Sequence, residues 1–393
     1  LAEHWGLDWA MQLNAQTKIM GTISQRQLMV RDPERFKGQP EKTILGKLAL
    51  NWRDRKGTWS VNTYYQVGSG LEQRKSFVYI EVPLGQGSFV WIDYNDDGVK
   101  DLNEFEIPAF GYEANYIRTQ VPTADFVSVG TTQATASLHW HPREGLGKKW
   151  SNAINVQNET KHQGGIRYRP GAEGVADTSI VQSLFLLRDQ LQWNAMDPRW
   201  GASLAYQWNQ SKSGLTLGYE WREERFISPQ LRAGIGEVWS VIPSYKKGWK
   251  TVASDFLTNR NYQVEYDAWW LQVQWKPTKA LLIQLQPEWI LKLTESNENV
   301  AIKRCVARGQ FQGTQRQNWQ GEIGFHQIVY SGNEQGSVYY DLLEGLQTGE
   351  NFTWSAQWQT MTGKLQWGLV YNGRSSRNQA VIHTGTLQVK AVF

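Results

Sequence analysis

The sequence predicts an all-β chain that folds as a transmembrane antiparallel β-barrel of about 16 strands. Three observations carry this prediction. Apolar and polar residues alternate through most of the chain, short and long connections alternate between the predicted strands, and tryptophans border the short connections. Alternation with a period of two is typical of strands with one apolar and one polar face. Helical periodicity is nearly absent, so the pattern favours a β fold throughout.

The alternation is clearest between residues 281 and 293. Apolar residues share one face of this predicted strand and polar residues share the other, namely Leu281, Ile283, Leu285, Trp289, Leu291 and Leu293 against Gln284, Gln286, Glu288 and Lys292. The same pattern runs through 44–52, 59–67, 202–208, 271–275, 352–358 and 365–371. We therefore expect Ile283 and Leu285 to face lipid, and Gln284 and Gln286 to face a wet or polar interior.

The predicted connections are of two kinds. Short turns rich in Pro, Gly, Lys and Arg lie at 53–58, 142–149, 195–199, 246–248, 277–279 and 362–363. Long polar segments fall between them, at 31–42, 68–125, 161–177 and 331–350. A soluble sandwich has no reason to sort its loops in this way, whereas outer-membrane barrels have short periplasmic turns and long extracellular loops. The segment 68–125 is accordingly predicted to be an extracellular insertion.

The short turns lead to a strand count of about 16, an even number that allows the last strand to pair with the first. The predicted strands start near Lys18, Thr43, Gly57, Phe126, Lys149, Thr178, Trp200, Arg222, Trp249, Tyr262, Lys279, Glu298, Gln317, Asn351, Lys364 and Val381. The chain opens at Leu1 without Met or an apolar signal segment, which indicates a mature form or a fragment. Residues 1–393 are thus expected to be one barrel or the C-terminal part of a longer protein.

The chain contains 21 tryptophans. Those beside the predicted short turns are Trp52, Trp59, Trp140, Trp150, Trp193, Trp200, Trp275, Trp358 and Trp367. Indole has an apolar body and a single N–H donor, so it suits a membrane–water boundary, and a ring of tryptophans at one level is an aromatic girdle. The alternatives are that these side chains pack a soluble core or stack on sugar rings. Core packing predicts no link to turn position, so the girdle is favoured.

Composition excludes several classes of function. The formal net charge is +4, from 41 Lys and Arg against 37 Asp and Glu, and no basic block indicates a nucleic-acid partner. Cys305 is the single cysteine, so there is no internal disulfide framework. His139 and His141 share one face of a predicted strand, but no third metal ligand is indicated nearby. No hydrolase, metalloprotease or phosphate-loop motif occurs, so a non-enzymatic protein is expected.

A calcium loop is the most specific local motif. Asp93, Asn95, Asp97, Val99, Asp101 and Glu104 occupy positions 1, 3, 5, 7, 9 and 12 of an EF-hand loop. Gly98 occupies position 6, where the chain must turn sharply. The preceding run 88–92 is β-like where an EF-hand has a helix. The sequence therefore predicts a structural Ca²⁺ site within the extracellular insertion, and the alternative is an acidic turn without an ion.

Two features also support a resemblance to known proteins. The last strand, with alternating apolar residues that close on Phe393, resembles the assembly signal of Gram-negative outer-membrane barrels. The segments EVPLGQGSFVWIDYNDDGVKDLNEFEIPAF, YYDLLEGLQTGENFTW and HTGTLQVKAVF together are similar to the C-terminal part of large, poorly characterised surface barrels of Bacteroidota. Those relatives extend further at the N-terminus. The resemblance implies an outer-membrane location but no activity and no catalytic residue.

Three functions are consistent with the sequence. The first is a non-enzymatic barrel that acts as scaffold or subunit of an outer-membrane assembly or translocation complex, with outer-membrane lipid and other outer-membrane or surface proteins as partners. This function is favoured because the long insertion is large enough to cap the lumen. The second is a porin-like or gated channel, since about 16 strands leave an aqueous lumen unless something fills it. The third is a soluble, Trp-rich carbohydrate-binding β protein.

Overall fold

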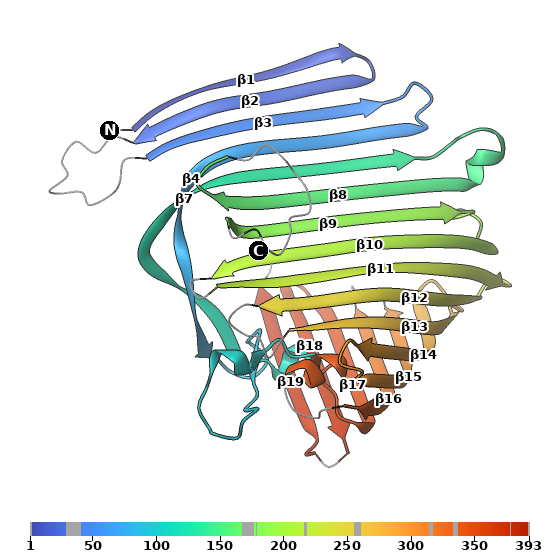
Figure 1. The fold of residues 1–393 in the computed structure, drawn as a ribbon. Helices are drawn as coiled ribbons and strands as arrows, with labels where there is room; N and C mark the ends of the chain where they lie inside the picture. The colour runs from blue at the N-terminus through green and yellow to red at the C-terminus, as the bar shows by residue number, and fades with distance from the viewer. Residues whose placement is uncertain are drawn as a thin grey trace.

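The computed structural model describes residues 2–28, 41–166, 177, 179–215, 218–254, 261–313, 317–332, 337–377 and 379–391. These residues form one antiparallel sheet of 17 strands and a separate two-stranded ribbon (Figure 1). The prediction of an all-β chain is confirmed. The strands of the large sheet are β1 (Ala2–Asn14), β2 (Thr17–Leu28), β3 (Glu41–Arg53), β4 (Trp59–Glu81), β7 (Tyr116–Trp140), β8 (Trp150–Gln163), β9 (Ile180–Trp193), β10 (Trp200–Leu215), β11 (Gly218–Ile235), β12 (Trp239–Ser254), β13 (Tyr262–Trp275), β14 (Leu281–Thr294), β15 (Asn299–Gln312), β16 (Asn318–Ser331), β17 (Gly349–Thr362), β18 (Leu365–Ser376) and β19 (Ile382–Ala391).

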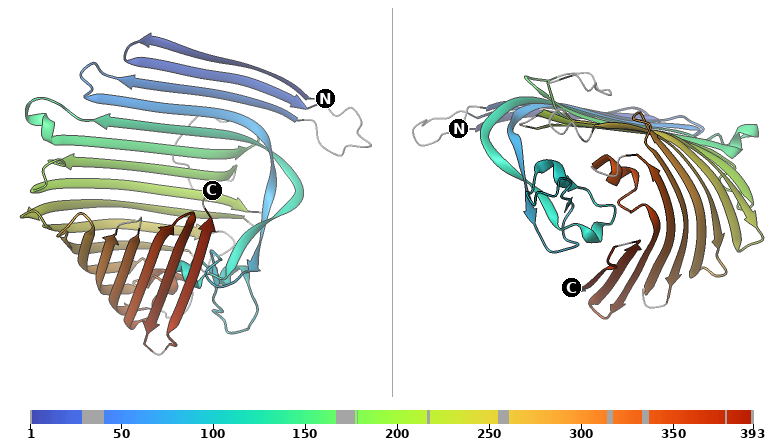
Figure 2. Two further views of the ribbon diagram at one scale, coloured as in Figure 1. Left: turned by 180° about the vertical axis from the view of Figure 1, so that it is seen from behind. Right: turned by 60° about the horizontal axis from the view of Figure 1, so that its bottom comes forward.

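The sheet is a meander in which each strand pairs with its neighbours in sequence, and β4 pairs directly with β7. It is nearly flat over the first strands and curls strongly over the last ones, as the right-hand view of Figure 2 shows. Within the described residues β1 is paired with β2 alone and β19 with β18 alone, so the sheet is open. The expected closure of the last strand on the first is therefore not formed. The sequence predicts an even number of strands, about 16, but the described residues form 17, because the prediction omits β1.

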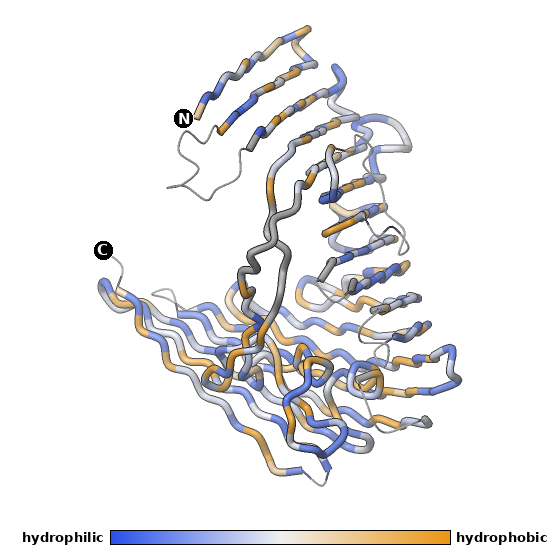
Figure 3. Tube along the Cα trace, turned by 60° about the vertical axis from the view of Figure 1, so that its left-hand side comes forward, coloured by the Kyte–Doolittle hydropathy of each residue, from blue (hydrophilic) through white to orange (hydrophobic). Residues whose placement is uncertain are grey.

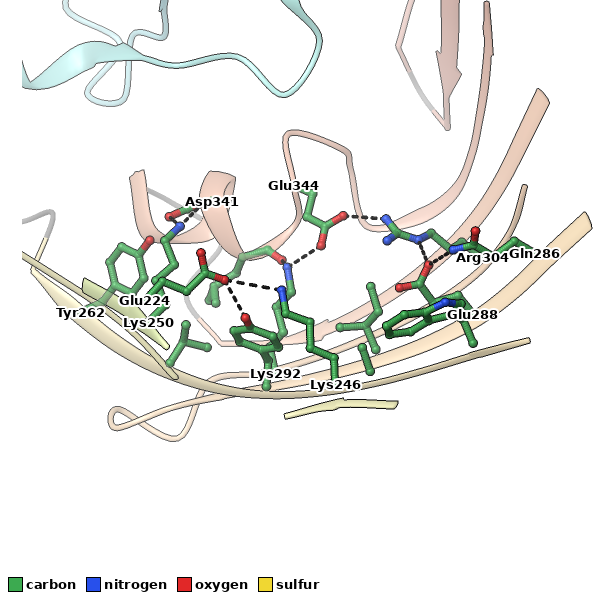
Figure 4. Close-up of a pocket in the computed structure, with 16 residues that line it drawn as sticks. Glu224, Lys246, Lys250, Tyr262, Gln286, Glu288, Lys292, Arg304, Asp341 and Glu344 are labelled. Carbon is green, nitrogen blue, oxygen red and sulfur yellow. Dashed lines mark hydrogen bonds and ion pairs between the residues drawn. The ribbon is translucent and has the colours of Figure 1, made fainter. Parts of the chain in front are cut away.

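The two faces of the sheet differ in polarity along most strands. Figure 3 shows hydrophilic and hydrophobic residues alternating along the chain trace. The registers keep one set of residues on the same face from strand to strand, so that Trp289 lies opposite Trp269 on β13 and Leu285 lies opposite Ala307 on β15. The even-numbered residues of β14, such as Glu288 and Lys292, point to the inside of the curl (Figure 4). The face that carries Trp289 and Leu285 is therefore the convex one in the curled part, and the other face is concave.

One predicted turn is wrong. Lys246–Gly248 lies inside β12, and the chain instead turns after β11 at Gly236, whose φ is +64°. Gly248 had indicated a turn, but its role is steric: a Cβ atom there would lie 2.3 Å from the ring of Tyr266 on β13. The glycine therefore makes room for a neighbouring aromatic ring within the strand. The predicted strand start at Trp249 is correspondingly about ten residues too late.

The predicted insertion 68–125 is strand at both of its ends. β4 and β7 continue side by side to the pair Glu81–Tyr116, and only residues 82–115 leave the sheet. We call residues 82–115 the hairpin tip. It contains η1 (Leu102–Glu104), η2 (Gly111–Glu113) and a ribbon of β5 (Val90–Trp91) with β6 (Phe105–Glu106). In Figure 2 the hairpin tip lies on the concave side of the curled part of the sheet.

A second segment also lies on the concave side. Residues 337–348, which we call the inner loop, include the six-residue helix α1 (Ser337–Leu342). A short helical turn, η3 (Gly145–Lys149), lies between β7 and β8. No helix in the part of the chain that the structure describes is long and apolar enough to cross a membrane. Phe393, whose position in the last strand had been predicted, lies outside the described residues.

Candidate functional site

The convex face carries an exposed apolar surface. On β14, Leu285 and Leu291 are 46% and 51% exposed, whereas Glu288 and Ile290 on the concave face are 6% and 4% exposed. The predicted sidedness of this strand is confirmed. A sheet in water has the opposite arrangement, with its apolar face buried. Further exposed apolar residues on the same face are Trp5, Leu7, Trp9, Ile23, Leu48, Leu204, Leu271, Ile323, Leu369, Leu387 and Val389.

Tryptophans line the short-turn edge of the sheet, as the sequence predicted. They meet in cross-strand pairs whose ring centroids lie 4.2–6.3 Å apart. Trp239 and Trp319 belong to these pairs although they had not been singled out, because the turns before them had been misplaced or missed. The pairs are Trp59–Trp140, Trp150–Trp193, Trp193–Trp200, Trp239–Trp275 and Trp319–Trp358.

Charged residues mark the other limit of the apolar surface on β12 and β13. Lys247 lies 2.5 Å from Glu265 and 3.6 Å from Asp267, all on the convex face. The strand from Trp239 to Lys247 has nine residues. A transmembrane strand tilted at about 45° needs about 9–11 residues to cross a bilayer core. On β12 and β13, the distance between the tryptophan row and this ionic cluster therefore suits a bilayer core.

The inner loop packs on the concave face through a small apolar core. Leu342, Leu343 and Leu346 are buried against inward-facing side chains of β13 to β16. The aliphatic side chains that the sheet contributes to this cluster include Ile290 of β14 and Ile302 of β15. The core therefore fixes the inner loop over this part of the sheet.

Ion pairs add to this contact (Figure 4). Glu344 lies 2.9 Å from Lys292 of β14 and 2.9 Å from Arg304 of β15, and Arg304 is also 2.7 Å from Glu288. Lys292 further donates a hydrogen bond of 2.8 Å to the carbonyl of Leu342. Burial would raise the pKa of the Glu344 carboxyl, but Lys292 and Arg304 outweigh it and hold the pKa at about 2. Glu344 is thus ionised at neutral pH and joins two strands to the inner loop.

A cavity of about 440 Å³ lies between the inner loop and strands β11 to β15. In its lining, Lys250 lies 2.6 Å from Asp341 of α1, and Lys246 lies 3.6 Å from Glu224. Tyr266 donates a hydrogen bond of 2.6 Å to the same Glu224 carboxylate. The lining holds equal numbers of cationic and carboxylate side chains, so the cavity wall is balanced in charge.

Arg374 of β18 joins the hairpin tip to the inner loop. It lies 2.5 Å from Glu113 of the tip and donates a hydrogen bond of 2.7 Å to the carbonyl of Gly345 in the inner loop. The backbone N–H of Ala109 donates to the hydroxyl of Tyr340 across 3.3 Å. Burial raises the pKa of the Glu113 carboxyl, although Arg374 opposes this effect. The two segments are therefore docked on each other as well as on the sheet.

The predicted calcium loop forms a compact turn in the hairpin tip. Asp93 accepts the backbone N–H of Gly98 at 2.8 Å and that of Asp97 at 3.3 Å, and Gly98 has a φ of +71°. Glu104 is 1% exposed and accepts hydrogen bonds from the indole of Trp91 at 2.9 Å and the N–H of Asp101 at 3.3 Å. Among the described residues, no three His, Cys, Asp or Glu side chains are grouped closely enough to hold a metal. Calcium binding stays a prediction.

Sequence reasoning missed the interior site almost entirely. Glu288 and Lys292 were assigned to the polar face of their strand, but their partners Arg304 and Glu344 were not identified. Charged side chains at inward positions of adjacent predicted strands were the one local sign in the sequence that ion pairs could form inside the sheet. His139, predicted to face the lumen, lies on the concave side opposite Ser60 and is exposed.

Comparisons with known proteins found no matching family model and no matching curated protein. Solved structures with some likeness include the FrpB iron transporter from Neisseria meningitidis, at a TM-score of 0.46 and 6% identity, over 95% of this chain and 59% of FrpB. They also include the ferric yersiniabactin uptake receptor FyuA from Yersinia pestis, at a TM-score of 0.37 and 9% identity, over 99% of this chain and 69% of FyuA. This chain therefore spans less than two thirds of the length of FrpB. At such scores these likenesses do not establish the class of this chain, which follows from its own strand pairing.

Proposed function

We propose that this chain belongs to a β-barrel of the Gram-negative outer membrane and acts as a non-enzymatic scaffold or subunit of an outer-membrane assembly or translocation complex. The observation that carries the proposal is the inverted burial of the curled part of the sheet: apolar side chains such as Leu285 and Leu291 are exposed on the convex face, and polar side chains such as Glu288 are buried on the concave face. Soluble monomers rarely expose contiguous apolar patches larger than a few hundred Å². Lipid contact removes this conflict, because the convex face is then solvated by acyl chains.

The paired tryptophans support the same location. In the membrane they form the girdle at the periplasmic interface, beside the short turns. The ionic cluster around Lys247 lies at the opposite interface. Outer-membrane lipid is thus the first partner, and no feature of the chain indicates a nucleic-acid partner.

The contents of the concave side favour a scaffold over an open pore. The inner loop and the hairpin tip both occupy this side, and Arg374 holds them together. A channel of this width conducts only if its lumen is free. The cavity of about 440 Å³ next to the inner loop is the observation that favours the second candidate, a gated channel, because movement of the inner loop would enlarge it. Single-channel conductance in planar bilayers separates the two: a scaffold stays closed at all applied voltages.

We further propose that the hairpin tip binds Ca²⁺ through Asp93, Asn95, Asp97, Val99, Asp101 and Glu104. The sharp turn at Gly98, with its positive φ, supports this assignment, since position 6 of a calcium loop requires it. The ion would stiffen the tip rather than take part in chemistry. A stiff tip offers a fixed surface to another outer-membrane or surface protein.

The location is tested by fractionating cells of a Gram-negative host that express the full gene product. An outer-membrane barrel is recovered in the outer-membrane fraction, resists extraction with alkaline carbonate and requires detergent for solution. A soluble carbohydrate-binding β protein would be recovered without detergent, and that result would contradict the proposal.

A further inference from the structure

The inward face of β13 is apolar and aromatic along the cavity beneath the inner loop. Tyr262, Tyr266 and Trp270 follow one another at every fourth position, and the buried residues Val264 and Ala268 separate them. All five side chains line the cavity, and the three aromatic ones are partly exposed. The Cα atoms of consecutive aromatic residues are roughly 13 Å apart, at about 3.3 Å per residue. We call Tyr262, Tyr266 and Trp270 the aromatic row.

Packing against the inner loop accounts for only part of the aromatic row. Tyr262 and Trp270 contact the apolar core that holds the inner loop, whereas Tyr266 does not belong to this core. Gly248 of β12 leaves room for the Tyr266 ring, since a Cβ atom there would lie 2.3 Å from it. The cavity itself, at about 440 Å³, falls within the range of roughly 300–1,000 Å³ that is typical of small-molecule sites.

Each ring of the aromatic row has a charged side chain of an adjacent strand beside it. A ligand along the row would therefore meet the same combination three times, an aromatic ring and a hydrogen-bonding group. Linear saccharides repeat a matching combination, because each sugar unit has C–H bonds on its faces and hydroxyl groups at its edge. The pairs are Tyr262 with Lys250, whose ammonium is 5.6 Å from the ring centroid, Tyr266 with Lys246 at 5.0 Å, and Trp270 with Glu288, which lies opposite it on β14.

The charges of the lining favour a neutral ligand. Each of the four cationic side chains in the lining already has a carboxylate partner (Figure 4). An ionic ligand would compete for one of these groups and leave its partner unpaired in a partly buried site, which is costly. A neutral ligand leaves every pair intact. The pairs are Lys246–Glu224 at 3.6 Å, Lys250–Asp341 at 2.6 Å, Lys292–Glu344 at 2.9 Å and Arg304–Glu288 at 2.7 Å.

One hydrogen-bonding group of the aromatic row is not used by the protein itself. The hydroxyl of Tyr262 is buried and has no hydrogen-bond partner among the described residues. Tyr262 lines the main cavity and also a second cavity of about 260 Å³, which borders the hairpin tip at Glu106 and Ala109. Buried polar atoms in native structures nearly always have a partner. A ligand hydroxyl would satisfy the Tyr262 hydroxyl as both donor and acceptor.

We infer that the cavity binds a neutral linear oligosaccharide along the aromatic row. Its sugar rings stack on Trp270 and the two tyrosines, and its hydroxyl groups bond to the flanking ion pairs and to Tyr262. Asp341 and Glu344 line the site from the inner loop. The inference goes beyond the proposed scaffold function. It depends on contacts of the concave face alone, so it does not require the proposed membrane location.

The test is saturation-transfer NMR with the full chain in lipid nanodiscs, which avoids detergents with sugar head groups. The neutral probes are maltohexaose and cellohexaose, with glucose for comparison. Hexagalacturonate and the glucosamine hexamer are the negatively and positively charged counterparts, and a Ser-Gly repeat peptide is a neutral chain without sugar rings.

Three variants locate the binding. Trp270→Leu removes an indole but keeps an apolar side chain for the core. Trp269→Leu, the next residue on the convex face, is its matched control. Tyr262→Phe removes only the hydroxyl that has no partner among the described residues, so it leaves the contacts of the folded chain intact.

We expect at least one neutral hexasaccharide to bind, about ten-fold or more tightly than glucose, because it contacts more than one ring. Trp270→Leu should weaken this binding by about ten-fold and Tyr262→Phe by about 2–10-fold, as for one lost hydrogen bond, whereas Trp269→Leu should not change it. The inference is overturned if neither neutral hexasaccharide binds to the folded protein, if a charged hexamer or the peptide binds equally well, or if Trp270→Leu and Trp269→Leu behave alike. Each of these results leaves the proposed outer-membrane location intact, because fractionation tests it separately.

Discussion

The flat and the curled parts of the sheet have the same alternation of residues but different interiors. In the flat part, β1 to β10, polar side chains of the concave face stay accessible, as in the exposed hydrogen bonds between Thr22 and Asp8 and between Arg188 and Gln207. In the curled part, β12 to β19, the inner loop and the hairpin tip cover the concave face and bury side chains such as Glu288. Pairing of strands builds both parts, but the concave face becomes an interior only where the inserted segments cover it. In the flat part, buried polar side chains such as Asn158 and Lys212 lie on the convex face instead.

The difference suggests where stability comes from. The flat part depends on its hydrogen-bond ladders and, in the proposed location, on lipid at its convex face. The curled part has in addition an apolar core around Leu343 and the ion pairs of Glu344. Perturbing the convex face should therefore affect both parts alike, whereas perturbing the interior should affect the curled part alone.

The largest effect is expected from charge on the convex face. Leu285→Arg should destabilise the protein by roughly 2–4 kcal/mol, because it places a cation against lipid near the bilayer centre. Gln284→Arg, one residue away on the concave face, is the matched control and should have little effect. Leu7→Arg in β1 extends the test to the flat part and should behave like Leu285→Arg. The measurement is urea unfolding in lipid bilayers. If Arg is tolerated equally at positions 284 and 285, the strand does not face lipid.

A smaller, local effect is expected from the interior ion pairs. Glu344→Gln removes the charge that pairs with Lys292 and Arg304, at a cost of about 1–3 kcal/mol after allowance for partial solvent access. Hydrogen exchange should become faster in the inner loop and unchanged in β2 to β8. Glu144→Gln, which breaks an exposed pair with Lys56 at 3.9 Å, is the control and should leave exchange unaltered everywhere. Equal acceleration in both parts of the sheet would contradict a role confined to the curled part.

The same contact should depend on pH. The folded pKa of Glu344 is about 2, below the ordinary value of 4.5, so its ionised form stabilises the docked loop. The stabilisation is complete above pH 4.5 and is lost as the pH falls towards 2. Limited proteolysis with pepsin at several pH values in this window should show increasing cleavage of the inner loop. In the Glu344→Gln variant, the inner loop should already be cleaved at the upper end of this pH window. If Glu344→Gln shows the same dependence of cleavage on pH as the native chain, Glu344 is not the group whose protonation releases the loop.

The smallest effect on the sheet is expected from the calcium loop. Chelation should increase proteolysis between residues 85 and 106 and leave the strands intact. Glu104→Gln should have the same effect in the presence of Ca²⁺, because Gln retains an oxygen for Trp91 and Asp101 but loses the charge that the ion needs. Asp96→Asn changes an acidic residue at position 4, which is not a ligand, and is the control. Cleavage that is the same with and without chelator would exclude a structural ion.

The sequence by itself determined the strand class and the two faces. Period-two alternation depends only on local backbone geometry, and so Leu281–Leu293 could be assigned to opposite faces residue by residue. The position of most tryptophans beside short turns was also visible, since both features are local. The turn at Lys246–Gly248 failed because a glycine that avoids a neighbouring ring has the same local signature as a glycine in a turn.

Only the tertiary structure decided what lies inside. Glu344 and Lys292 are far apart in the chain, and nothing local indicates that the segment after β16 folds back over β14 rather than extending into solvent. The same holds for the contacts of Arg374 with Glu113 and Gly345, because these three residues come from three separate regions of the chain. The open edges are likewise a tertiary property: each strand specifies its own alternation, but the direction of the last strand relative to the first depends on the count of all the strands between them.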